Sequence, residues 1–538
     1  MKRKWITLLT ITSIIAILVM GCSASKTKNV KSDGVFNVAI STDLPTMDPV
    51  QCNDYSAELV INNLYDTLLK FSVEDNHLEP GLAKSWEKVD ELTYVYQLRD
   101  DVYFWDGQKM TADDVVFSLR RHMDPSLASL FGPKFNAVES IEKTGDFEVT
   151  IRLSYQSESF KYIPATMAGS VVEKAFVEEA GENFGKTNTG TMGTGPYKFD
   201  SWTEGSTIIF KKNENYWDSS VSYPEDVLEF DIIADVTSVG LALTSGQVDF
   251  FNTPTEEVRE QVASSDKVEN KYAKGLQNSF IYFNSGAGPF NDINLRKAAA
   301  TALDTNAIAL ATRGEGFFDK SKALDVDPQV MGYYPEDWIA LNDELDSYEY
   351  NLEKAKEYMA QSAYPDGVEV TMPTCTLVQK ESEAAQYYLK QIGINVKLET
   401  VPFSDFILYV YGVLLDDQGQ RDYDLLAFAW FPDFADPVAL LYLYQGINIG
   451  IGGYNMANYL NPEVDSLIEL SDIQSGQERS ETLMKAYRII NEACTGKMIS
   501  YFGPSCSINT NYSVELPAMW MWNFNFTQVH KKNETNNN

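Results

Sequence analysis

The sequence predicts a mixed α/β protein built in several lobes, and three observations support this fold class. The chain has 538 residues, and at roughly 150 residues per domain this length suggests three to four domain-sized units. Hydrophobic residues make up 44% and charged residues 22%, as in an ordinary globular protein with a sizeable core. Short strand-like runs alternate with short helical stretches along the chain, without a repeat of fixed period.

The individual elements follow from residue pattern and end signals. Seven runs rich in β-branched and aromatic residues predict strands at 36–40, 93–98, 149–153, 207–211, 280–283, 368–372 and 396–399. Thr111 caps a predicted helix with acidic residues in its first turn and Arg120 and Arg121 in its last, which suits the helix dipole. Further helices are predicted around 295–302, after the cap Asn351, and from 381 to 391, before Gly393.

The first 33 residues predict export and a lipid anchor. Three basic residues at 2–4 precede an apolar stretch at 5–20, which is shorter than the ~20 residues that span a bilayer and is typical of a signal peptide. Gly21 directly before Cys22 resembles the bacterial lipobox, so we expect residues 1–21 to be removed, Cys22 to be acylated and 22–33 to form a tether. An ordinary secretory signal that contains a cysteine is the alternative.

Charge and histidine content exclude several classes of function. The chain has 43 Lys and Arg against 77 Asp and Glu, a net charge of −34, which repels phosphate backbones and argues against nucleic-acid binding. The three histidines lie far apart, and none has a metal-ligand spacing with a cysteine. We therefore expect no metal and no cofactor.

Four cysteines follow Cys22, at positions 52, 375, 494 and 506. An exported protein permits disulfides, and Cys494 and Cys506 are the favoured pair because they bracket a short segment. Buried free thiols are the equal alternative, since a core of this size needs no covalent staple.

Asp433 and Asp436 lie in an aromatic, proline-rich run, AWFPDFADP at 429–437. Two carboxylates across a cleft are the acid and base of a glycosidase when they lie ~5–10 Å apart. Both aspartates also suit the turns around the two prolines. A third interpretation is one carboxylate among aromatic rings that binds a cationic ligand, since a charge-assisted bond to an ammonium is strong in a dry pocket.

Motifs spread over nearly the whole chain resemble the extracytoplasmic solute-binding proteins of ABC importers, specifically the oligopeptide/dipeptide-binding family, family 5. These motifs are TMDP at 46–49, GLAKSWE at 81–87, LRDDVYFWDG at 98–107, TADDVVFS at 111–118, GTGPY at 193–197, NENYW at 213–217, LTSGQVD at 243–249, FNDINLRKA at 290–298, IGINV at 392–396 and YDL at 423–425. The segment 98–118 is the most specific of them. Most of these residues also have scaffold roles, so they identify the fold more than the site.

The resemblance implies a type II periplasmic-binding-protein fold, with two hinged lobes and an extra third domain. The implied divisions are lobe I at 34–70, 191–283 and 496–530, an extra domain at 71–190, lobe II at 284–495 and a disordered tail at 531–538. Such lobes close around the ligand by a hinge movement.

The resemblance also implies site residues for a peptide held as an extended strand. Asp433 matches the aspartate that pairs with the free α-amino group. The remaining implied contacts are the backbones of Ala427, Phe428, Ala429 and Trp430 with the Trp430 ring, and Asn53, Asp54 and Tyr55 in the opposite wall, unless 53–55 form a solvent-facing loop. An arginine that some members carry is Ala427 here. Arg313 and Lys380 are therefore candidate cations for the ligand carboxylate, and solvated surface charge is the alternative for each.

We expect a monomeric, non-enzymatic lipoprotein at the extracytoplasmic face of the membrane. It delivers short peptides to the permease and ATPase subunits of an ABC importer. The alternative on the same fold is an oligosaccharide, opine or metal-chelate ligand. The alternative from another class is a secreted hydrolase that uses Asp433 and Asp436.

Overall fold

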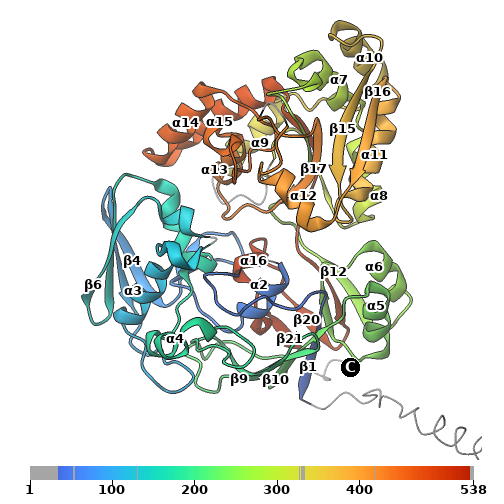
Figure 1. Cartoon of the computed structure of the whole chain (residues 1–538). Coiled ribbons are helices and arrows are strands. Elements are labelled where there is room, and N and C mark those ends of the chain that lie inside the picture. The colour runs from blue at the N-terminus through green and yellow to red at the C-terminus, as the bar shows by residue number, and fades with distance from the viewer. Residues whose placement is uncertain are drawn as a thin grey trace, which may run out of the picture.

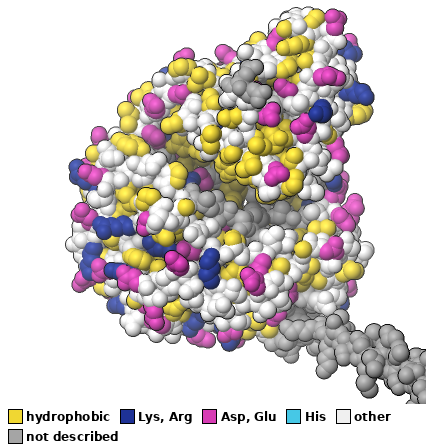
Figure 2. All heavy atoms as spheres, in the orientation of Figure 1, with side chains coloured by type: hydrophobic (Ala, Val, Ile, Leu, Met, Phe, Trp, Pro, Cys, Tyr) yellow, Lys and Arg dark blue, Asp and Glu magenta, His cyan; other side chains and the backbone are white. Residues whose placement is uncertain are grey.

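The computed structural model describes residues 34–52, 55–129, 131–325, 327–328, 334–416 and 419–532. The signal segment, Cys22, the tether, Asn53 and Asp54 lie outside these residues, as does the end of the predicted tail. Two bodies lie one above the other, joined on the right in Figure 1, and the space-filling surface is hollowed between them (Figure 2).

Lobe I, in the lower body, is built on a seven-stranded sheet in the order β12-β19-β11-β1-β10-β9-β8. Its strands are β1 (Val35–Ile40), β8 (Tyr197–Thr203), β9 (Thr207–Lys212), β10 (Val227–Ile232), β11 (Phe250–Asn252), β12 (Val268–Tyr272) and β19 (Ser505–Asn509). β1 pairs in parallel with β10 and β11, and five of its six residues are buried, as expected of a central parallel strand. Its further elements are α2 (Tyr55–Ile61), α5 (Val236–Ser245), α6 (Glu256–Val262), α16 (Trp520–Asn523) and the hairpin β20 (Tyr512–Val514) and β21 (Val529–Lys531).

The extra domain forms the left part of the lower body in Figure 1. Its antiparallel sheet has the order β4 (Ala83–Asp90), β5 (Thr93–Leu98), β7 (Glu148–Leu153) and β6 (Val138–Gly145). Helix α3 (Ala112–Arg121) begins as predicted, because the Thr111 backbone N–H donates to the Asp114 carboxylate at 3.0 Å. This region also contains the short strands β2 (Leu69–Phe71) and β3 (Leu78–Pro80), helix α4 (Lys174–Ala180) and, among its 3-10 helices, η2 (Gly132–Phe135) and η3 (Glu158–Ala165).

Lobe II is the upper body. One sheet has the order β14 (Asp319–Lys320), β18 (Gly496–Phe502), β13 (Gln277–Phe283) and β17 (Leu425–Trp430), and a second pairs β15 (Val368–Thr374) with β16 (Ile394–Thr400). Its helices are α7 (Ile293–Ala302), α8 (Thr305–Arg313), α9 (Pro335–Glu344), α10 (Leu352–Gln361), α11 (Gln379–Lys390), α12 (Phe403–Val410), α13 (Val438–Leu441), α14 (Pro462–Asp472) and α15 (Gly476–Ala493). Among the described helices, none is long and apolar enough to cross a bilayer.

The chain passes between the lobes at 273–276 and at 503–504. A glycine in each of these two segments packs closely against the backbone of the other segment. A Cβ on Gly503 would lie 2.2 Å from the Ala273 carbonyl oxygen, and one on Gly275 would lie 2.5 Å from the Gly503 Cα. The predicted boundaries assign β13 and β18 to lobe I, whereas these strands pair with β17 and β14. The limits of the domains otherwise stay a prediction.

All seven predicted strands and all four predicted helices are confirmed. The predicted tail begins too early, because Lys531 pairs with Tyr512 in the last hairpin. Of the two alternatives at Cys494 and Cys506, the disulfide is wrong and the free thiols are confirmed, because both side chains are buried and unbridged. Cys494 lies at the end of α15, whereas Cys506 lies in the lobe I sheet. Burial raises the pKa of the Cys494 thiol to about 12, which makes this thiol unreactive.

Candidate ligand-binding site

Strand β17 carries four of the predicted contact residues, Ala427 to Trp430, and it ends its sheet. It pairs with β13, with Trp430 opposite Asn278, and the sheet order of the described residues places no strand beyond it. The residue before β17 is hydrogen-bonded to β15, because the Asp424 carboxylate accepts the Thr371 backbone N–H at 2.7 Å. The outer edge of β17 therefore presents backbone groups in the pattern that a further strand requires.

Aromatic rings line the end of this strand. The Phe428 and Trp430 ring centroids lie 6.0 Å apart, and the Trp430 and Tyr454 centroids lie 5.6 Å apart. Phe428, Ala429 and Trp430 are half-buried, whereas the side chain of Ala427 is buried. Ala427 can therefore contact a ligand through its backbone only, and Trp430 can contact one through its ring.

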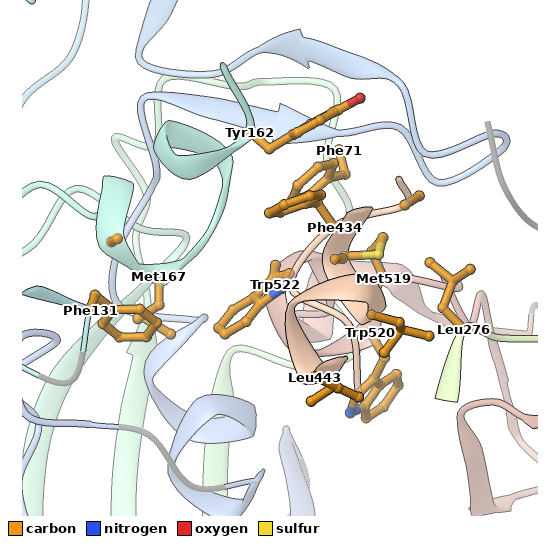
Figure 3. Packing of buried hydrophobic residues seen from close by; sticks show 14 of the residues in the cluster. Phe71, Phe131, Tyr162, Met167, Leu276, Phe434, Leu443, Met519, Trp520 and Trp522 are labelled. Carbon is orange, nitrogen blue, oxygen red and sulfur yellow. The ribbon is translucent and has the colours of Figure 1, made fainter. Parts of the chain in front are cut away.

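The loop after β17 is fixed by the extra domain. Phe434 is buried and stacks on Tyr162 of η3, with centroids 4.7 Å apart and planes 12° apart. Tyr162 in turn stacks on Phe71 at 6.4 Å, so that three rings from separate segments lie together (Figure 3). The ring of Phe434 thereby determines where the neighbouring Asp433 lies.

Asp436 is a structural residue. Its two carboxylate oxygens accept hydrogen bonds from the Arg479 guanidinium at 2.6 and 3.0 Å, and both side chains are fully buried. The Tyr162 hydroxyl donates to the same carboxylate at 3.2 Å. Burial favours the protonated acid, but Arg479 outweighs it and holds the pKa of Asp436 below its usual value. A carboxylate held in this way is not available as the acid or base of a hydrolase.

Asp433 faces the extra domain at the rim where the two bodies meet. Its carboxylate forms an ion pair with the Lys134 ammonium of η2, and the side chains of Asp433 and Lys134 are 38% and 23% exposed. Tyr411 and Tyr454 lie near Asp433, and burial together with this carboxylate raises the pKa of both hydroxyls, that of Tyr454 to about 12. Asp433 is thus a partly hydrated anion among aromatic residues and one lysine.

Lys134 was absent from the residues predicted to form the site. Its partner is 299 residues away along the chain, and the surrounding Gly-Pro-Lys-Phe sequence has no pattern that marks a binding residue. Only the packing of the extra domain against lobe II brings the two charges together.

The two candidate cations for a ligand carboxylate lie at the other rim, where α8 and α11 of lobe II approach α6 of lobe I (Figure 1). Lys380 is 61% exposed and pairs with Glu256 at 3.2 Å, as a surface charge does. Arg313 lies over the Phe502 ring at 3.5 Å and is 3.7 Å from Glu381, and burial lowers its pKa. The Arg313 Nε has no hydrogen-bond partner among the described residues. Within the same part of the chain, the ion pairs of Arg313 and Lys380 are with Glu381 and Glu256 and not with Asp433.

The opposite wall of the predicted site is described in part. Asn53 and Asp54 lie outside the described residues, and Tyr55 is the first residue of α2. Their contacts with a ligand therefore stay a prediction.

Comparison with known proteins identifies the family. The family model of the bacterial extracellular solute-binding proteins, family 5 (middle), matches residues 77–449. The chain belongs to this family. The resemblance read from the motifs is confirmed, and so is the mixed α/β class of the fold.

Curated relatives of family 5 extend over most of the chain. Heme-binding protein A of Haemophilus influenzae is 28% identical over 462 residues, which cover 80% of each chain. Oligopeptide-binding protein AppA of Bacillus subtilis is 27% identical over 539 residues, which cover 91% of this chain and 92% of the relative.

Solved structures of similar proteins share the fold. The periplasmic binding protein DppA of Helicobacter pylori, in complex with the peptide STSA, has a TM-score of 0.77 at 25% identity and covers 93% of this chain and 98% of its own. The substrate-binding protein CtaP of Listeria monocytogenes has a TM-score of 0.79 at 22% identity, covering 93% of this chain and all of its own.

Proposed function

We propose that this protein is the substrate-binding component of an ABC importer and captures short peptides in extended form between its lobes. The observation that carries the proposal is the edge strand β17, which is followed within three residues by the partly exposed carboxylate of Asp433. An unpaired strand edge binds the backbone of a peptide whatever its side chains are. A carboxylate beyond the end of that strand binds the peptide's ammonium.

The comparisons support a peptide ligand. Relatives are described as oligopeptide-binding or bound to a peptide, but one relative is described as heme-binding and a structural neighbour is a complex with agropinic acid. Among these ligands, the edge of β17 and the carboxylate of Asp433 favour a peptide. An uncharged sugar would give this carboxylate no ionic partner.

In the proposed complex, the backbone groups of 427–430 pair with the ligand backbone and the Trp430 ring forms the wall of a side-chain pocket. Asn53, Asp54 and Tyr55 supply contacts from lobe I. Water bridges variable side chains to the pocket, which allows one site to accept many sequences. The protein binds and releases its ligand without a chemical step.

For the ligand carboxylate, Arg313 is the better of the two candidates. The exposed Lys380 already has an ionic partner in Glu256, whereas the largely buried guanidinium of Arg313 retains hydrogen-bond capacity at Nε within the described chain. We also propose that acylated Cys22 anchors a monomer to the membrane, where the permease and ATPase receive the ligand. Two or more acyl chains are needed for stable anchoring.

Mass spectrometry of the small molecules released from the purified, unfolded protein tests the proposed function. The expected result is a set of peptides with free amino termini and a narrow range of lengths. The Asp433→Asn variant, purified in the same way, is the matched control and should release far less. Release of a sugar, an opine or a haem, with the same yield from both proteins, would overturn the proposal.

A further inference from the structure

The Lys134 ammonium occupies the place at Asp433 that the proposed function gives to the ligand's ammonium. We propose that Lys134 is an intramolecular competitor at this site, so that it sets how strongly the protein discriminates between free and blocked amino termini. This inference rests on the proposed function, but the ion pair on which it depends can be tested without a ligand.

Both partners are held by rigid surroundings. Lys134 lies in η2, next to Pro133, and the two phenylalanines that flank this turn, Phe131 and Phe135, are buried in the extra domain. Phe131 packs edge-on against Trp522, and Phe135 packs edge-on against Phe160. Asp433 is held by the stacking of Phe434 on Tyr162. Packed aromatic residues therefore fix the backbone on each side of the ion pair, so Lys134 and Asp433 meet in a set position and not as two free surface side chains.

The ion pair is nonetheless one that a ligand can displace. With side chains 38% and 23% exposed, Asp433 and Lys134 keep part of their hydration, and ion pairs of this kind are weak. Asp436 of the same loop shows the contrast, because its ion pair with Arg479 of α15 is fully buried. The loop thus supplies the carboxylate of one enclosed ion pair and of one partly hydrated ion pair.

Two consequences follow for ligands. A peptide with a free ammonium must displace Lys134, which weakens its apparent affinity. A peptide with a blocked amino terminus leaves Lys134 in place, so Asp433 keeps an ionic partner and the blocked peptide avoids the cost of an unpaired carboxylate. Removing Lys134 should therefore strengthen binding of the free peptide and widen the ratio between free and blocked forms.

The test is titration calorimetry of the whole protein with the tetrapeptide Ser-Thr-Ser-Ala and its N-acetylated form. Lys134→Met removes the charge and keeps an unbranched side chain. Lys143→Met is the matched control, because Lys143 pairs with Asp113 inside the extra domain at 2.8 Å. Lys134→Met should raise the ratio of the two affinities at least threefold, and Lys143→Met should leave it unchanged. An unchanged or smaller ratio in Lys134→Met would overturn the inference while the proposed function stands.

A measurement without ligand separates the two failures. If the wild type binds neither peptide, the proposed function fails for this ligand class, and with it the discrimination between free and blocked peptides. The ion pair on which the inference depends is tested separately, by the melting temperatures of the wild type, Lys134→Met, Asp433→Asn and the double variant. Non-additive shifts show that the ion pair forms in solution, as the inference requires, and additive shifts overturn the inference.

Discussion

Phe434 of lobe II and Tyr162 of the extra domain stack with ring centroids 4.7 Å apart and planes 12° apart. The residues on either side of this contact in the lobe II loop, Asp433 and Asp436, also contact the extra domain, through Lys134 and the Tyr162 hydroxyl. One aromatic contact thus joins the two bodies and places the proposed ammonium-binding carboxylate.

Removing the Tyr162 ring should weaken ligand binding. A stacked aromatic pair is worth about 0.5–1.5 kcal/mol beyond its burial, so Tyr162→Ala should lower peptide affinity roughly threefold to tenfold in calorimetry. Tyr162→Phe keeps the ring and loses only the hydroxyl bond to Asp436, so it should bind nearly as the wild type does. Equal affinities in the Ala variant and the wild type would show that this contact does not support the bound state.

The buried pair of Asp436 and Arg479 should be required for stability. Arg479→Met leaves a fully buried carboxylate without its cation, which costs about 3–5 kcal/mol, and scanning calorimetry should show a large fall in the melting temperature. The double variant Arg479→Met and Asp436→Leu removes both charges and should recover part of the loss. A single variant as stable as the wild type would show that Asp436 has another partner.

Asp472 should make the stability of the protein depend on pH. Burial raises the pKa of this carboxyl to about 6 in the folded protein, and the Ser159 hydroxyl donates to it at 3.3 Å. Because the folded pKa lies above the unfolded value of ~3.9, the contribution of Asp472 is fully present below about pH 4 and is lost as the pH rises through about 6. Asp472→Asn should therefore raise the melting temperature at pH 7.5 and flatten its change between pH 4 and 6. A lower melting temperature at pH 7.5 would contradict the raised pKa.

Arg313 should distinguish ligands by their carboxyl terminus. Arg313→Met should weaken binding of a free-acid peptide at least fivefold and leave its C-terminal amide unaffected, because only the free acid forms a charge-assisted bond, worth about 1.5–3 kcal/mol. Lys380→Met is the matched control and should change neither affinity. If the Arg313 variant loses affinity for both peptides equally, its role is structural.

The local signals in the sequence predicted most of the fold. Thr111 and Asn351 cap helices, and the run at 93–98 forms a strand, because hydrophobic periodicity and capping act within a few residues. The pairing of strands that lie far apart in the chain could not be predicted from such local signals. The assignment of β13 and β18 depends on their register with β17 and β14, and neither strand contains that information alone.

The same distinction applies to the site. Asp433 and Trp430 could be named because they lie in one aromatic run that resembles a known family. Lys134 could not, since its role depends on how η2 packs against a loop 299 residues away. The three interpretations of Asp433 and Asp436 could not be separated from the sequence, because the Arg479 guanidinium that pairs with Asp436 comes from a distant helix.

Calorimetry of the wild type and Asp433→Asn with one peptide, in free and N-acetylated forms, tests the central claim most directly. The wild type should bind the free form at least tenfold more tightly than the acetylated form, and Asp433→Asn should lose that preference while it remains folded. Equal binding of both forms by the wild type, or an unchanged preference in the variant, would contradict recognition of a peptide ammonium by this carboxylate.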